Sequence, residues 1–350
     1  MNKTWVTVLM VLFASPLARA GEEDGTVSGW VRNGTGDSTG VPNEEVVLYR
    51  YAGGKKEEGF SRKTRTDDTG YFRFDGLPVG EGIAYYPVAL HDGVEYAGDQ
   101  VDFSSVSSPF EQQSDIVVYE STSSDSAISV PFHHIIISPD RGVADIREVL
   151  FFANRGNRTY VGSHDYSPGK PEVLDLEIPV GSTGLALDGD IMTCCIIVDG
   201  NRVIDTMELK PGARRVIADY RMPYKGSTAR FRKTIGYATG ALDLFVLGSA
   251  VENVTVQPPG GEPASVIPGE VETTPSFKIR GRDYTRYSLG EIPGGSMVTV
   301  TFRGMVSTFR IYRWLAPAAV ILLMVAVSAY HRMRSKSEDS LTQSQRRKVD

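Results

Sequence analysis

An uncharged apolar segment near the carboxyl end constrains this chain more than any other feature. Residues 314–330, WLAPAAVILLMVAVSAY, carry no charge, and a basic cluster follows at once. As a helix the segment would be roughly 25 Å long, close to the roughly 30 Å of a bilayer's hydrocarbon core. The segment therefore predicts one transmembrane helix. The residues that define this anchor are Trp314, Pro317, Tyr330, Arg332 and Arg334.

The two ends of the chain predict where the remainder lies. Residues 1–20 have the basic start, short apolar run and small-x-small site of a secretory signal peptide. Basic residues after the apolar segment place residues 331–350 in the cytoplasm by the positive-inside rule. We therefore expect a single-pass protein of the cytoplasmic membrane whose residues 21–310 are extracytoplasmic, either periplasmic or on the cell surface.

Charge and cysteine content exclude some classes of function. The formal net charge is −6, and basic residues gather at both ends, so the exported part is acidic. Such a body does not attract phosphate backbones, and nucleic acid is not an expected partner. The two cysteines, Cys194 and Cys195, are adjacent in a predicted strand, which would turn one thiol to the core and the other outward. A disulfide between neighbours is strained, so we expect core burial to hold the fold.

Residues 25–103 alternate between apolar and polar positions, with turn residues between the runs. This period of two, without helical segments, predicts antiparallel strands. The predicted fold class is all-β, with two or three tandem β-sandwiches followed by the transmembrane helix. The side chains expected to face the first core are Val27, Gly29 and Val31; Val46 and Leu48; Phe72 and Phe74; Tyr86, Val88 and Leu90; and Val101 and Phe103.

One block in this region has turn and strand residues at fixed offsets. Residues 66–80 read T-D-x-x-G-Y-F-x-F-x-G-L-P-x-G, in which Asp67 can cap a turn and Gly70 can take a positive φ. With the earlier runs 25–31 and 41–48, the block resembles the carboxypeptidase regulatory-like family. The resemblance implies a seven-stranded sandwich similar to transthyretin. It implies no active site, because in metallocarboxypeptidases the zinc lies in a separate catalytic domain.

The second region begins after residues 104–126, which we interpret as a linker with a crossing strand. Alternation resumes over residues 127–306, and Asp199-Gly200 predicts a tight hairpin. Repeated apolar-Pro-Gly turns resemble those of fibronectin type III and immunoglobulin-like sandwiches. They favour two sandwiches divided near residue 220, with one large sandwich as the alternative.

The sequence predicts no catalytic, cofactor or metal site, and we expect no enzyme activity. His133 and His134 are adjacent in a predicted strand, so they would face opposite ways and could not share a metal. The familiar hydrolase and nucleotide-binding motifs are missing from the sequence. Three tyrosines remain as a candidate surface for stacking on a sugar or peptide, namely Tyr71, Tyr85 and Tyr96.

These features together predict a non-enzymatic, membrane-anchored envelope protein that presents β-sandwiches for protein binding or scaffolding. A regulatory-like module with one carboxy-terminal anchor resembles bacterial envelope proteins. Two alternatives stay open at this point. One is a carbohydrate-binding surface protein, and the other is an accessory or assembly subunit of an envelope membrane complex, including a redox complex. The expected partner is accordingly another envelope protein or a glycan.

Overall fold

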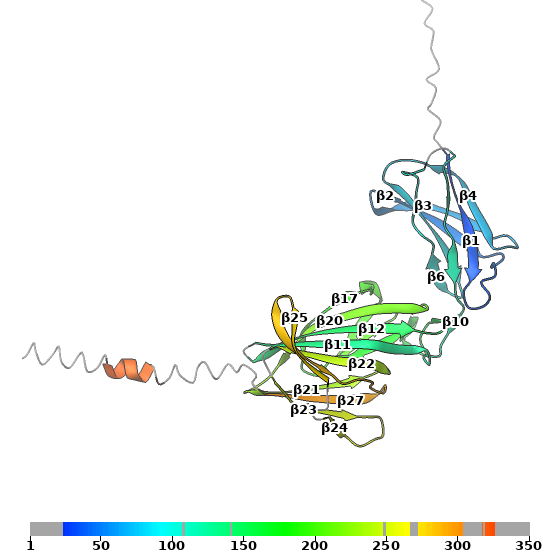
Figure 1. Ribbon diagram of the computed structural model, residues 1–350. Helices are drawn as coiled ribbons and strands as arrows, with labels where there is room; N and C mark the ends of the chain where they lie inside the picture. The colour runs from blue at the N-terminus through cyan, green and yellow to red at the C-terminus, as the bar shows by residue number, and fades with distance from the viewer. Residues whose placement is uncertain are drawn as a thin grey trace, which may run out of the picture. The chain divides into compact units, whose positions relative to one another are not determined.

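The computed structural model describes residues 24–106, 109–140, 142–247, 250–266, 272–303, 317 and 319–325. The chain divides into two compact units, Met1–Ser121 and Thr122–Asp350 (Figure 1). Strands dominate both units, which confirms the all-β class.

The first unit consists of two sheets whose apolar faces are buried against each other. Tyr85 joins them, because its hydroxyl donates to the carbonyl of Pro78 in the opposite sheet at 2.9 Å. One sheet has the order β4-β1-β8, with β9 also on β1, and the other has the order β3-β2-β5-β6, with β7 on β5. The strands are β1 (Asp24–Asn33), β2 (Glu45–Ala52), β3 (Lys55–Arg65), β4 (Tyr71–Pro78), β5 (Ile83–His91), β6 (Val94–Ala97), β7 (Val101–Asp102), β8 (Glu111–Gln113) and β9 (Ile116–Val118).

The turn before β4 forms as the sequence predicts. The Asp67 carboxylate accepts hydrogen bonds from the backbone N–H groups of Thr69 at 2.8 Å and Tyr71 at 3.0 Å. Gly70 has a φ of 83°. Phe72 and Phe74 then alternate inward and are 1% and 5% exposed. The block thus folds as one turn-and-strand unit.

The predicted linker at 104–126 is wrong over much of its length. β8 and β9 both pair in parallel with β1, so they belong to the first unit. Ile116 and Val118 are fully buried. The stretch is polar in composition because it buries few side chains; none of the three residues of β8 is buried. The boundary between the units falls after Ser121.

The second unit is built on a seven-stranded sheet with the order β17-β20-β12-β11-β22-β26-β25. A four-stranded sheet, β21-β27-β23-β24, and a three-stranded sheet, β16-β19-β18, cover its inner face. The strands of the large sheet are β11 (Ile128–Asp140), β12 (Val143–Asn154), β17 (Thr183–Gly189), β20 (Gly212–Pro223), β22 (Thr239–Leu247), β25 (Glu272–Ile279) and β26 (Arg282–Ser288). The covering strands are β16 (Leu174–Glu177), β18 (Ile196–Asp199), β19 (Arg202–Asp205), β21 (Thr228–Ile235), β23 (Ala250–Gln257), β24 (Ala264–Val266) and β27 (Ser296–Arg303).

Short elements complete the second unit, and the first of them begins at the boundary residue Ser121. They are β10 (Ser121–Thr122) with β13 (Thr159–Tyr160), β14 (Asp165–Ser167) with β15 (Lys170–Pro171), and the 3-10 turn η1 (Thr193–Cys195). The Asp199-Gly200 hairpin is confirmed, because β18 pairs antiparallel with β19 and Gly200 has a φ of 60°.

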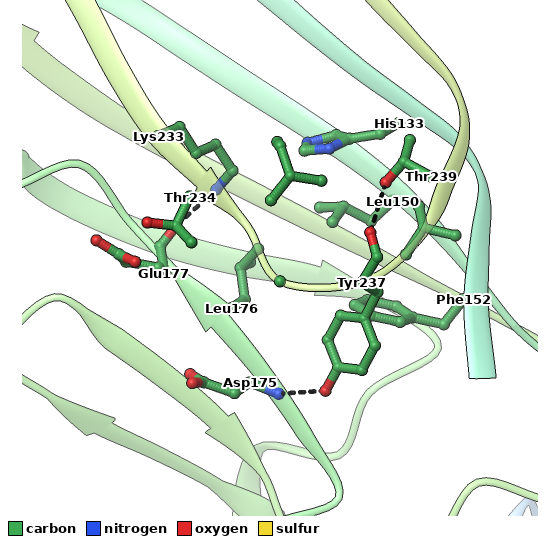
Figure 2. A pocket seen from close by; sticks show the side chains of 13 residues that line it. His133, Leu150, Phe152, Asp175, Leu176, Glu177, Lys233, Thr234, Tyr237 and Thr239 are labelled. Atoms are coloured by element: carbon green, nitrogen blue, oxygen red, sulfur yellow. Dashed lines mark hydrogen bonds between the residues drawn. The ribbon is translucent and has the colours of Figure 1, made fainter. Parts of the chain in front are cut away.

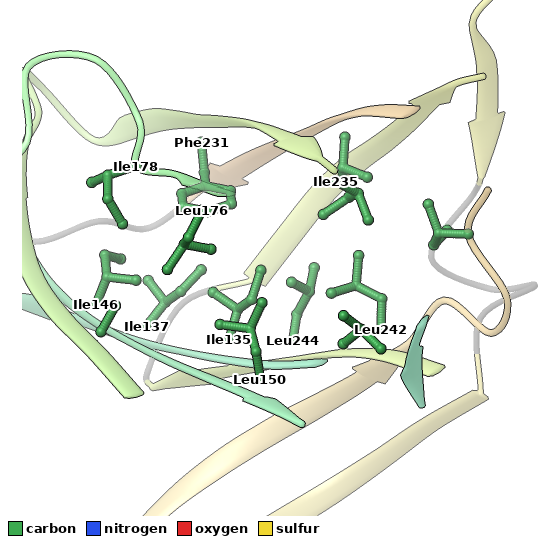
Figure 3. Packing of buried hydrophobic residues seen from close by; sticks show 14 of the residues in the cluster. Ile135, Ile137, Ile146, Leu150, Leu176, Ile178, Phe231, Ile235, Leu242 and Leu244 are labelled. Carbon is green, nitrogen blue, oxygen red and sulfur yellow. The ribbon is translucent and has the colours of Figure 1, made fainter. Parts of the chain in front are cut away.

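A single core fills the space between the layers of the second unit (Figure 3). Ile135 and Leu150 come from the large sheet, Phe231 from β21 and Leu176 from β16. Each of these side chains is at most 7% exposed. These side chains pack against one another, and this shared core holds the three sheets together as one body.

The division into two sandwiches near residue 220 is wrong. That residue lies inside β20, and β11 pairs in parallel with β22, with Ile135 opposite Leu244. Strands from both sides of the expected boundary therefore share one sheet. The apolar-Pro-Gly turns mark the ends of strands, but they do not specify which strands pair.

Part of the predicted anchor is described. Pro317 and residues 319–325 are helical and exposed, and five large apolar side chains from Ile321 to Val325 are 58–70% exposed. Among the described residues, no helix has both the length and the hydrophobicity needed to span a bilayer. Trp314, Tyr330, Arg332 and Arg334 lie outside the described residues, as do the predicted signal peptide and tail.

Candidate binding face

The outer face of the seven-stranded sheet carries apolar side chains that the core does not cover. Strand alternation sends one row of each strand to the core and the other row outward. Phe132 and Phe277 on the outward rows are 54% and 48% exposed. We define the outer face by Phe132, Ile136, Val149, Phe151, Ile217, Phe245 and Phe277. Phe245 is 5% exposed and therefore buried within this face, and Ile136, Val149, Phe151 and Ile217 are half-buried.

Strand register brings apolar side chains of the outer face together. Phe132 lies directly opposite Phe151, and Ile136 directly opposite Phe245. The ring of Phe245 contacts that of Phe277 with 5.3 Å between centroids. Val149 in turn pairs with Ile217. The apolar side chains thus form two neighbouring groups, one with Phe132, Phe151, Val149 and Ile217 and the other with Ile136, Phe245 and Phe277, and His134 lies between them on β11.

Ion pairs lie among these apolar side chains, because Arg147 is opposite Ile136, and Asp243 is opposite His134, which lies between Phe132 and Ile136 on the outward row of β11. Arg147 binds the carboxylate of Asp219 through two hydrogen bonds of 2.7 and 2.8 Å. On the other side Arg286 binds both oxygens of Asp243 at 3.1 and 3.0 Å. His134 lies 3.4 Å from the same carboxylate, although burial lowers the pKa of its imidazole. Apolar and charged side chains thus occur together on this face, and protein–protein interfaces also combine the two.

A groove of about 420 Å³ continues the outer face toward the β25–β26 hairpin. Ile136 and Arg147 contribute to both, and Tyr284, Arg280 and Arg282 line the hairpin side. Neither Arg280 nor Arg282 forms an ion pair with another described residue. The groove therefore offers positive charge beside an apolar surface.

A cluster of charged and polar side chains lies inside the core of the second unit, where the sequence analysis expected none. The Glu148 carboxylate accepts from His133 Nε2 at 2.8 Å and from Lys233 Nζ at 3.0 Å, and Tyr220 donates to its other oxygen. Lys233 also donates to the carbonyl of Glu177 at 2.5 Å. The sequence did hold a signal, because Glu148 and Lys233 occupy inward positions of otherwise apolar alternations.

Burial makes this cluster structural. Glu148 is 0% exposed and Lys233 2%, and each has its opposite charge or hydrogen-bond partners within the core. Burial lowers the pKa of His133 despite the neighbouring carboxylate, so its imidazole is neutral and donates through Nε2. The cavity next to it is only about 20 Å³, which is room for one water (Figure 2). No substrate of ordinary size fits there.

Acid should destabilise the second unit through this cluster. Burial alone would raise the pKa of Glu148, but Lys233, His133 and Tyr220 lower it from 4.5 to about 2. A lowered pKa gives stability that is complete above pH 4.5 and is lost toward pH 2, amounting to roughly 3 kcal/mol. His133 adds to the trend below pH 6.5, because the fold favours its neutral form. Urea unfolding, monitored through the amide hydrogen exchange of β12, should show a free energy of unfolding that falls as the pH drops below 6.5.

The same measurement on Glu148→Gln provides the control. This variant lacks the carboxylate, so its stability should change little between pH 4.5 and pH 2 by comparison with the original chain. An equally steep decline in both proteins would contradict the assignment.

The predicted tyrosine surface is wrong for two of its three members. Tyr85 and Tyr96 are 0% and 3% exposed and belong to the core of the first unit. Their hydroxyls are satisfied by backbone carbonyls, Tyr96 donating to Tyr119 at 2.8 Å, and a paired hydroxyl allows the ring to be buried. Tyr71 alone stays partly exposed, packed beside Trp30 with ring centroids 5.2 Å apart.

Of the other sequence predictions, the one for the two adjacent histidines is confirmed and the one for the two adjacent cysteines is wrong. His133 and His134 do face opposite sides of β11, as expected. Cys194 and Cys195 do not lie in a strand with one thiol in the core, because η1 replaces the start of that strand. Cys194 is exposed and Cys195 intermediate. In the described part of the chain, no three His, Cys, Asp or Glu side chains converge to hold a metal.

Comparisons with known proteins assign no family. No family model and no curated protein matches the chain. Solved structures with some similarity include an M1 zinc metallopeptidase from Deinococcus radiodurans, with 8% identity and a TM-score of 0.28 over 49% of this chain and 42% of that one. Leukotriene A4 hydrolase from Saccharomyces cerevisiae matches with 8% identity and a TM-score of 0.26 over 50% and 29%. BcpA, the major pilin subunit of Bacillus cereus, matches with 12% identity and a TM-score of 0.18 over 79% and 87%.

The chain thus spans less than half of the peptidases that it matches first. At these TM-scores the similarities carry no argument about activity.

Proposed function

We propose that this chain is a non-enzymatic, single-pass membrane protein that presents its two β units outside the cytoplasmic membrane and binds another envelope protein. The first unit is, in this proposal, a carboxypeptidase regulatory-like module. The outer face of the second unit is the binding surface. The proposal assigns no catalytic residue, cofactor or metal.

The observation that carries the proposal is the outer face itself. Exposed Phe132 lies on the central strand β11 and exposed Phe277 on the edge strand β25, with two ion pairs among the apolar residues. Grouped exposed apolar side chains are typical of interaction sites, whereas isolated surface apolar residues are ordinary. Arg280 and Arg282, which form no ion pair with another described residue, favour a partner that places carboxylates beside its own apolar residues.

The proposed anchor has its own support. The helical residues 319–325 expose a continuous set of large apolar side chains that no described residue covers. A surface of that kind is stable in lipid and unfavourable in water. With the basic residues that follow in the sequence, it supports a cytoplasmic tail and an extracytoplasmic body.

A charge placed on the outer face should abolish partner binding. We expect Phe132→Glu to reduce the protein recovered with the full-length chain from crosslinked membranes by about thirtyfold, since a central interface residue is worth about 2 kcal/mol. Leu90→Glu is the matched control, because Leu90 is 51% exposed on a strand of the first unit. That variant should keep its partner.

Equal recovery by the original chain and Phe132→Glu would contradict the assignment of the outer face. The ratio of the two recovered proteins separates the remaining alternatives. A fixed ratio would indicate an accessory subunit of one complex, whereas recovery of glycan in place of protein would favour the carbohydrate-binding alternative.

A further inference from the structure

The adjacent thiols of η1 lie close together at the surface. Cys194 Sγ and Cys195 Sγ are 3.4 Å apart, with Cys194 exposed and Cys195 half-buried. The turn sits directly before β18, on the outer layer of the second unit. Neither thiol is part of the core or of the outer face defined above. The pair is therefore free to react.

Hydrogen bonds hold one cysteine of the pair in place. The carbonyl of Cys195 accepts from the backbone N–H of Thr206 at 2.8 Å and from its hydroxyl at 2.9 Å. The N–H of Cys195 donates to the carbonyl of Met192 at 2.9 Å. Cys195 is thus fixed to the neighbouring segment, while Cys194 projects at the tip of the turn.

A bond between these sulfurs would differ from a structural disulfide. Neighbouring Cα atoms are about 3.8 Å apart, whereas ordinary disulfides join Cα atoms about 4.4–6.8 Å apart. The resulting ring is strained, and strained exposed disulfides are the ones that exchange with other thiols. The two Sγ atoms already face each other at 3.4 Å, and bond formation would bring them to about 2.05 Å with adjustment of the turn.

We propose that Cys194 and Cys195 are a reversible dithiol–disulfide site that exchanges with disulfide compounds or proteins. In the forward direction the Cys194 thiolate attacks one sulfur of the external disulfide and releases the first thiol. Cys195 then loses its proton and attacks Cys194 Sγ, which releases the second thiol. The two cysteines are oxidised by two electrons, and the external disulfide is reduced to two thiols.

The order of attack follows from exposure. Cys194 is open to solvent, so an external disulfide can reach its sulfur. Burial raises the pKa of Cys195, as does its contact with Cys194, so at neutral pH less of it is thiolate. Once the mixed disulfide has formed on Cys194, Cys194 Sγ lies beside the thiol of Cys195. The second attack is therefore intramolecular.

The test uses the reduced full-length chain in detergent and oxidised glutathione as the probe, with intact-mass spectrometry and maleimide labelling. We expect the original chain to lose two hydrogens and both maleimide additions without retaining glutathione. Cys195→Ser should instead retain one glutathione, because the resolving thiol is gone. Cys194→Ser should take up glutathione about tenfold more slowly.

Three results would overturn the proposal. The original chain could keep both thiols in excess oxidised glutathione, or it could accumulate glutathione adducts or linked dimers in place of the internal disulfide. The two serine variants could also react at the same rate, which would remove the assigned order. Thr206→Val is a further check, since losing the hydroxyl bond to Cys195 should slow closure without preventing the first attack.

Discussion

Replacing Glu148 with alanine should lower the free energy of unfolding of the second unit by about 3–5 kcal/mol. Lys233 would then keep a buried charge without its carboxylate, 3.0 Å away in the original chain. Tyr220 and His133 would also lose their acceptor. Urea unfolding of the full-length chain, followed by amide exchange of β12, measures the change.

Two variants make this result specific. Asp145→Ala removes a carboxylate from the same strand, but its pair with Arg221 is exposed, so the cost should stay below about 1 kcal/mol. The double variant Glu148→Leu/Lys233→Met replaces the pair by apolar groups and should recover most of the loss. If the single Glu148→Ala change proved as mild as Asp145→Ala, the buried cluster would not be stabilising the core.

Replacing Gly70 with alanine should destabilise the first unit by about 2–5 kcal/mol. The positive φ of 83° costs an alanine about 1–2 kcal/mol. In addition its Cβ would lie 2.7 Å from the carbonyl oxygen of Val31 and from the backbone of Gly40, a contact that costs about 1–3 kcal/mol. Amide exchange of β1 and β4 in the full-length chain reports the effect.

Gly93→Ala separates the two causes. Gly93 has a φ of 78°, close to that of Gly70, but a Cβ there would meet no atom within 4 Å. Its replacement should therefore cost only the conformational part, about 1–2 kcal/mol. A similar loss of unfolding free energy at both positions would show that the close backbone approach at Gly70 does not affect stability.

Local features of the fold could be predicted because each depends on neighbouring residues. Asp67 caps its turn and Gly70 takes the positive φ, since both follow from short-range hydrogen bonding and sterics. The Asp199-Gly200 hairpin forms for the same reason. His133 and His134 face opposite ways because alternation is a property of any strand.

Which face of a strand is buried was harder to predict where both faces are apolar. The expected inward set in β5 was Tyr86, Val88 and Leu90, yet Tyr85 and Ala89 are fully buried and Leu90 is 51% exposed. A shift of one residue exchanges the two faces of a strand. The sequence does not reveal that the Tyr85 hydroxyl finds the carbonyl of Pro78, which decides the choice.

The candidate site depends on pairing between distant strands and therefore could not be found by pattern alone. Phe132 meets Phe151, and Ile136 meets Phe245, only because β11 pairs with β12 and β22 at once. The alternating pattern predicted both strands but not their adjacency. Glu148 and Lys233 were visible as charges at inward positions, but only the fold shows that they meet.

The parallel pairing of β11 with β22 also sets an order for folding during synthesis. β11 is the first strand of the seven-stranded sheet, yet its partner along one edge begins only at Thr239, after β12 to β21 have been made. Until that strand emerges, β11 exposes unpaired N–H and C=O groups beside apolar residues, a state prone to aggregation. The amino-terminal unit contains all its own strands and can close first. We therefore expect a nascent chain halted between β20 and β22 to require a chaperone, whereas one halted after β27 would not.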